Sequence, residues 1–82
     1  MKSKCNIYSV MLEGTDGSMG YFMNFEVAAR DPIQAEELAR QRARELGLNV
    51  VGVEEITDTT KSFSSSPQVL STSGKSYFPT GH

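Results

Sequence analysis

The sequence has few residues of the kinds that carry most enzyme chemistry. Its 82 residues include one cysteine, Cys5, one histidine, His82, and no tryptophan. One cysteine excludes an internal disulfide, which suits a reducing compartment, and a single Cys and a single His are too few for a zinc site. His82 is the last residue, where we expect no packed shell to orient it, so a Ser–His or Cys–His dyad is not expected.

Long apolar runs and a strong net charge are also missing. No apolar run approaches the roughly 20 residues that span a bilayer, and the start Met-Lys-Ser-Lys is not followed by a signal-peptide core. The formal net charge of −2 gives no overall field that would attract nucleic acid or an anionic membrane. We therefore expect a cytoplasmic protein that does not bind membranes.

Composition divides the chain near residue 58. Eleven of the 25 residues 58–82 are Ser or Thr, a content that favours a flexible segment, whereas apolar residues recur regularly before it. The sequence predicts a domain over 1–57 and an extension over 58–82. In the extension, Gln68–Thr72 and Lys75–Phe78 flank a Ser73-Gly74 turn, so it either adds an edge strand or hairpin, docks as an arm on a neighbouring subunit, or stays flexible.

The first half reads as two strands and a helix. Apolar residues fill both faces of Cys5–Leu12, and every second residue of 21–27 is strongly apolar, which predicts two strands joined by a loop with an Asp16-Gly17 turn. Asp31 is a suitable N-cap and Gly47 a suitable stop for a helix over Pro32–Leu46. Its predicted buried stripe is Ala35, Leu38, Ala39, Ala43 and Leu46, with Ile33 near the start.

A third strand is predicted over Asn49–Thr57. Strand–helix–strand connections are right-handed and place their two strands parallel. The apolar residues on both faces of Cys5–Leu12 favour a position for that strand between the other two. The predicted fold is a small α+β domain of β-β-α-β type, with strand order 2-1-3 and one helix covering one face of the sheet.

One helix covers one face only, so the other face is expected to be open. The residues predicted to be exposed there are Ile7, Met11, Phe22 and Ile56. Large apolar patches are rare on soluble monomers, which predicts a homodimer through the open face or an edge. We interpret the chain as a non-enzymatic interaction module that binds itself and a protein partner.

The sequence contains few features that indicate other functions. Weak nucleic-acid binding is the main alternative, and its candidate contacts are Arg40, Arg44, Lys61 and Lys75. Ser73-Gly74-Lys75-Ser76 ends like a phosphate-binding loop but lacks the earlier glycine and the following helix. Carboxylates at Glu13 and Asp16, or at Glu54, Glu55 and Asp58, lack calcium-loop spacing, so neither a metal nor a cofactor is predicted. An enzyme site assembled between subunits stays open.

Overall fold

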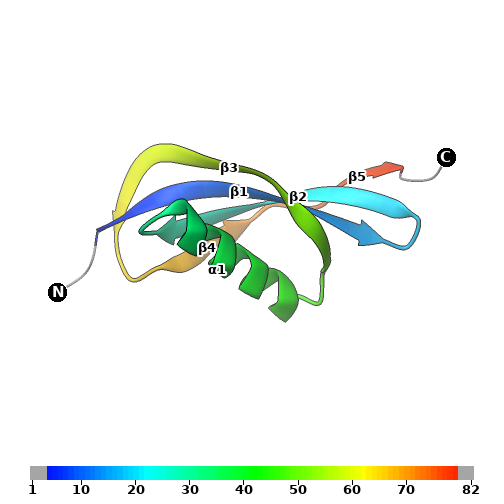
Figure 1. The fold of residues 1–82 in the computed structure, drawn as a ribbon, viewed down its shortest axis with the longest axis horizontal. Coiled ribbons are helices and arrows are strands. Elements are labelled where there is room, and N and C mark those ends of the chain that lie inside the picture. Colours follow the sequence, from blue (N-terminus) through cyan, green and yellow to red (C-terminus); the bar gives the residue numbers. More distant parts are fainter. Residues whose placement is uncertain (1–3, 80–82) are drawn as a thin grey trace.

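The computed structural model describes residues 4–79, which form a five-stranded antiparallel sheet with one helix. In chain order the elements are β1 (Lys4–Asp16), β2 (Met19–Ala29), α1 (Pro32–Glu45), β3 (Asn49–Ser64), β4 (Gln68–Thr72) and β5 (Ser76–Pro79). Figure 1 shows an elongated molecule in which α1 lies against one side of the sheet, and its principal extents are 51 × 23 × 19 Å. The predicted α+β class is confirmed.

The strand order is β3-β1-β2-β4, with β5 also paired to β2. Because β1 is antiparallel to both β2 and β3, these two strands run parallel to each other, as expected for a strand–helix–strand unit. The predicted order 2-1-3 differs from this sheet, because it lacks the strands that the extension adds. Both β4 and β5 lie on the edge of β2 that β1 leaves free.

Local capping sets the limits of α1. The side chain of Asp31 accepts a hydrogen bond from the backbone N–H of Gln34 at 2.7 Å, which satisfies one of the unpaired donors of the first turn. Gly47 has a φ of +73°, the left-handed conformation that ends a helix and that glycine adopts without strain. The helix ends at Glu45, one residue before the predicted end at Leu46.

The core lies between α1 and the sheet. Small side chains let the helix approach the strands closely, and large ones from β1 and β2 fill the space beneath it. Two predicted core residues are outside it: Ile33 is 72% and Leu46 is 43% exposed, because Ile33 lies two residues, or about 200°, before the alanine stripe and Leu46 is already the C-cap. The buried cluster consists of Tyr8, Val10, Leu12, Tyr21, Met23, Phe25, Val27, Ala29, Ala35, Ala39 and Ala43.

Strand β3 is longer than predicted and irregular. It continues through the predicted boundary at residues 57 and 58 as far as Ser64. Its register against β1 shifts at three places, so that 16 residues of β3 (49–64) face 12 of β1 (4–15). Such bulges bend a strand and increase its twist, and Figure 1 shows β3 arching over the sheet. Thr60, within one shift, has a φ of +64°.

The extension forms strands where the sequence placed them, but their pairing differs from the predicted hairpin. β4 pairs with residues 25–28 of β2, and β5 pairs with residues 19–22. The two strands therefore lie end to end along the same edge rather than side by side. The reason is that β2 has a long free edge with many unpaired backbone N–H and C=O groups. A hairpin could pair only one of its two strands with this edge, whereas two strands placed end to end both pair with it.

Candidate interaction surfaces

The side of the sheet opposite α1 carries half-buried side chains along β1 and β2, although Cys5 and Ala28 at one end of it are fully buried. Side chains alternate between the two sides of a strand, so the residues between the buried ones point away from the helix. Ser9 donates a hydrogen bond to the side-chain oxygen of Asn24 at 2.7 Å in the middle of this side. This side of the sheet carries both apolar and acidic residues, and we call it the acidic face. Its residues are Ile7, Met11, Phe22, Phe78, Glu13, Glu26 and Glu55.

Three of the four predicted surface residues lie on the acidic face. Ile7, Met11 and Phe22 are each half-buried there, and the hydrogen-bonded Ser9 separates Ile7 from Met11. Ile56 lies on the other side, because it pairs with Val10 and packs against the core beneath α1. It is therefore not part of the surface on which the sequence placed it.

Phe78 is a member of the acidic face that sequence reasoning missed. Its ring stacks on Phe22 with the centroids 4.8 Å apart and the planes at 30°. Stacked aromatic pairs of this geometry add stability beyond the apolar area that they bury. The only available signal was an aromatic residue in a Ser-rich segment, and that pattern does not say which strand the residue would join.

The carboxylates of the acidic face are unpaired. Glu13 and Glu26 extend from β1 and β2, and Glu55 lies opposite Met11 on β3. None of the three forms a salt bridge or a side-chain hydrogen bond with the described residues, whereas the carboxylates of Glu36 and Glu45 on α1 do. Charges of one sign that stand beside apolar side chains favour a partner of opposite charge.

The predicted nucleic-acid contacts do not form one basic surface. Two of them are neutralised within the chain, because Arg40 pairs with Glu36 at 2.9 Å and Lys75 with Asp16 at 3.5 Å. Lys61 lies in the register shift opposite Ile7, nine residues along β1 from Asp16, which is about 30 Å at the rise of a strand. The cations at Arg40, Arg44, Lys61 and Lys75 are thus spread along the molecule.

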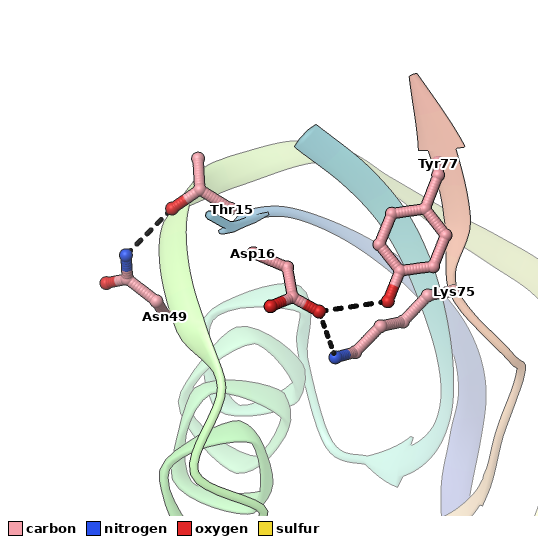
Figure 2. Close-up of polar contacts among 5 residues, drawn as sticks. All are labelled: Thr15, Asp16, Asn49, Lys75 and Tyr77. Atoms are coloured by element: carbon pink, nitrogen blue, oxygen red, sulfur yellow. Dashed lines mark hydrogen bonds and ion pairs between the residues drawn. The ribbon is translucent and has the colours of Figure 1, made fainter. Parts of the chain in front are cut away.

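A polar cluster joins β5 to the tip of the β1–β2 hairpin. The carboxylate of Asp16 accepts a hydrogen bond from the Tyr77 hydroxyl at 3.0 Å and pairs with the Lys75 ammonium at 3.5 Å, as Figure 2 shows. Lys75 Nζ also lies 4.8 Å from the centroid of the Tyr21 ring, a cation–π contact. Beside this cluster, the Asn49 amide donates to the hydroxyl of Thr15 at 2.7 Å.

Opposing effects act on the pKa of Lys75. Desolvation lowers it, but the attraction of Tyr77, Asp16 and Tyr21, with the hydrogen bond to Asp16, raises it by more, so the pKa lies above the usual 10.5. The lysine therefore stays charged at neutral pH. The cluster holds β5 against the β1–β2 hairpin.

A shallow hollow of about 380 Å³ separates α1 from β4. Its lining includes the apolar side chains of Leu38 and Val69 and the ion pair between Arg42 and Glu45 at 3.3 Å. An ion pair that satisfies itself leaves little charge for a ligand.

The residues weighed for catalysis do not meet. Cys5 is fully buried, and its Sγ donates to the carbonyl oxygen of Ser65 at 3.4 Å. Within residues 4–79 no three His, Cys, Asp or Glu side chains are placed to hold a metal ion. The segment that ends like a phosphate-binding loop leads into β5, not a helix. The His82 prediction lies outside the described residues.

The helix that the structure describes is too short and too polar to cross a membrane.

Comparison with known proteins gave no match: no family model fits the chain, and no curated protein or solved structure is significantly similar to it. The geometry of the acidic face and of the β5 contacts is therefore the basis for the proposals that follow.

Proposed function

We propose that the protein is a small, non-enzymatic interaction module that binds a partner protein through its acidic face. The observation that supports this most is a set of three carboxylates, Glu13, Glu26 and Glu55, which form no salt bridge within residues 4–79 and lie around half-buried apolar side chains. Apolar groups outside a core cost free energy in water, and burying them against a partner recovers it.

The charges indicate the kind of partner. Carboxylates that pair with Lys or Arg across an interface speed the encounter and select the partner, whereas like charges brought together cost several kcal/mol. Two copies placed face to face would bring six glutamates together, so the acidic face suits a different protein. That partner has an apolar centre of similar width and Lys or Arg side chains around it.

Charge reversal on the face provides the test. Tagged full-length protein is used to capture partners from cells at low salt, the captured protein is identified and purified, and its dissociation constant is measured with three versions of the chain. We expect Glu26→Lys to weaken binding about tenfold or more, equivalent to ~1.4 kcal/mol, and added salt to weaken it further.

The matched control is Glu37→Lys. Glu37 is an exposed glutamate on α1 that forms no salt bridge within the described residues, so its reversal changes the net charge equally but not the acidic face. We expect this variant to bind as the unmodified chain does. Equal losses with both variants, or a captured protein indifferent to both, would contradict the proposal.

A further inference from the structure

The strand β5 with Lys75 before it, residues 75–79, makes its specific contacts with one hairpin, and we call this segment the β5 arm. Its backbone pairs with residues 19–22 of β2. Its two aromatic side chains contact the two sides of that strand: Tyr77 meets Tyr21 edge-on with the ring centroids 5.8 Å apart, and Phe78 stacks on Phe22. With the Asp16 contacts, these interactions all involve β1 and β2.

The arm is joined to the rest of the sheet by a short irregular segment. Thr72 lies opposite Phe25 and Ser76 opposite Phe22, so three residues of the extension span the space of two on β2. Ser73 is held by hydrogen bonds with the backbone of Asn24, at 2.8 Å in each direction. Gly74, which follows, is exposed, and a Cβ built on it would meet nothing within 4 Å. Glycine has more backbone freedom than any other residue, so Gly74 is the position best suited to act as a hinge between the anchored strand and the arm.

Figure 1 places the arm at the end of the molecule that lies beyond α1. Among the elements, α1 packs against β1, β2, β3 and β4. Removing the arm from its place would therefore leave the contacts of α1 with these four strands in place. It would uncover the edge of β2 and the rings of Tyr21 and Phe22, which makes an empty edge unfavourable in water.

We propose that two copies of the chain exchange their β5 arms, so that each arm pairs with residues 19–22 of the other copy. Among the described residues, the strand pairing, the ion pair, the side-chain hydrogen bonds and the ring contacts of the arm are with a hairpin that the second copy also has, so exchange keeps these contacts and changes the hinge. The complementarity is specific to this arm: Asp16 faces its lysine and tyrosine hydroxyl, and Phe22 faces its phenylalanine. Exchange also removes the need to fit three residues into the space of two.

Exchange has a defined dependence on concentration. In the closed monomer the hinge keeps the arm near its own hairpin, at an effective concentration in the millimolar range for a short linker. Dimers therefore increase as the protein concentration approaches that range. This mode of assembly uses the edge of β2 and not the glutamates Glu13, Glu26 and Glu55. It goes beyond the proposed function, and the test of one is independent of the test of the other.

A charge swap distinguishes exchange from any other dimer. In the closed monomer, positions 16 and 75 face each other. The variant Asp16→Lys therefore has two lysines at these positions, and the variant Lys75→Asp has two aspartates. When the two variants are mixed, exchange pairs the two altered residues with each other at one arm and the unaltered Lys75 and Asp16 at the other arm, so both arms have opposite charges. We expect the association constant of the mixture to exceed that of either variant alone by about tenfold, measured by sedimentation equilibrium on full-length chains.

The outcome that overturns the proposal is a mixture that dimerises no more than the two variants separately. A dimer formed through another surface would give that result, because neither residue 16 nor residue 75 of one chain would then contact the other chain. Circular dichroism spectra of both variants, matched to that of the unmodified chain, show that the sheet and helix remain.

Cross-linking gives a second, independent test. Met19 and Pro79 lie opposite each other in the register, and directly opposed residues of antiparallel strands have a Cα separation within the range of a disulfide. Full-length Met19→Cys and Pro79→Cys chains are mixed at high concentration and oxidised. We expect a disulfide between the two introduced cysteines, and far less in a mixture of Pro79→Cys with Leu46→Cys, whose introduced thiol is exposed but distant. Equal yields in the two mixtures contradict arm exchange.

Discussion

The ring of Tyr21 occupies the space beside Gly14, directly opposite it in the β1–β2 ladder. A Cβ added to Gly14 would lie 2.5 Å from both Cζ and the hydroxyl oxygen of Tyr21, and 2.9 Å from the carbonyl oxygen of Asn49. Tyr21 is only 2% exposed, so its ring has no free space to enter. Glycine at this position is what lets a large aromatic side chain and the start of β3 pack against β1.

The substitution Gly14→Ala is therefore expected to destabilise the protein. Overpacking of this kind costs about 1–3 kcal/mol of the free energy of unfolding, which chemical denaturation at constant pH measures. The control is Gly52→Ala on β3, where a Cβ meets nothing within 4 Å and the stability should stay the same or rise. If the two substitutions lower stability equally, the close approach of Tyr21 to Gly14 is not what makes glycine necessary.

Removing the hydroxyl of Tyr21 is expected to stabilise the fold. This oxygen is buried and has no hydrogen-bond partner among the described residues, so it carries an uncompensated desolvation cost. Tyr21→Phe should raise the free energy of unfolding by up to about 1 kcal/mol. The matched change Tyr77→Phe removes a hydroxyl that donates to Asp16 and should lower the melting temperature instead. Changes of the same sign would contradict the difference between the two hydroxyls.

Thr60 holds a backbone conformation that β-branched residues rarely adopt. With a φ of +64°, the left-handed region costs a non-glycine residue roughly 1–2 kcal/mol, and glycine avoids this cost. Thr60→Gly should raise the free energy of unfolding by about 1 kcal/mol. Thr57→Gly, in a regular part of the same strand, should lower it. Thermal unfolding of the two variants tests this, and a loss of stability with Thr60→Gly would show that its side chain matters more than its φ.

The contribution of Lys75 is expected to disappear in strong base. Its pKa is higher in the folded protein than 10.5, so folding favours the charged form. The resulting stability is fully present below the unfolded pKa of 10.5 and is lost as the pH rises through the higher folded value. The difference in melting temperature between the unmodified chain and Lys75→Met should therefore shrink above pH 10.5. Lys61→Met, which removes a lysine without a salt bridge in residues 4–79, should show a smaller difference throughout.

The parts of the fold that could be predicted are those that depend on neighbours in the sequence. The limits of α1 follow from Asp31, whose carboxylate reaches the N–H of Gln34, and from Gly47, which takes the conformation that ends a helix. The alternation of Tyr21, Met23, Phe25 and Val27 likewise identified the buried side of β2. These signals act over a few residues, so the rest of the chain does not alter them.

The misplacement of Ile56 has a definite physical cause. Strict alternation puts Val53 and Ile56 on opposite sides of a strand, yet both pack against the core. Between them the register against β1 shifts, because Met11 pairs with Glu55 and Leu12 with Val53, which leaves Glu54 as an extra residue. One extra residue reverses the alternation. The bulge depends on β1, a strand more than 35 residues earlier, and no residue near Glu54 indicates it in the sequence.

By itself, the sequence determined a capped helix, two alternating strands and a polar extension with two short apolar segments, because capping, chain direction and side-chain period are local. Only the tertiary structure decided which side of the sheet each residue of β3 occupies and where the extension lies. Cross-strand pairing with β1 extends β3 through a Ser- and Thr-rich segment as far as Ser64. The strands β4 and β5 pair with the free edge of β2. Both outcomes depend on backbone groups of distant residues, which every amino acid except proline presents alike.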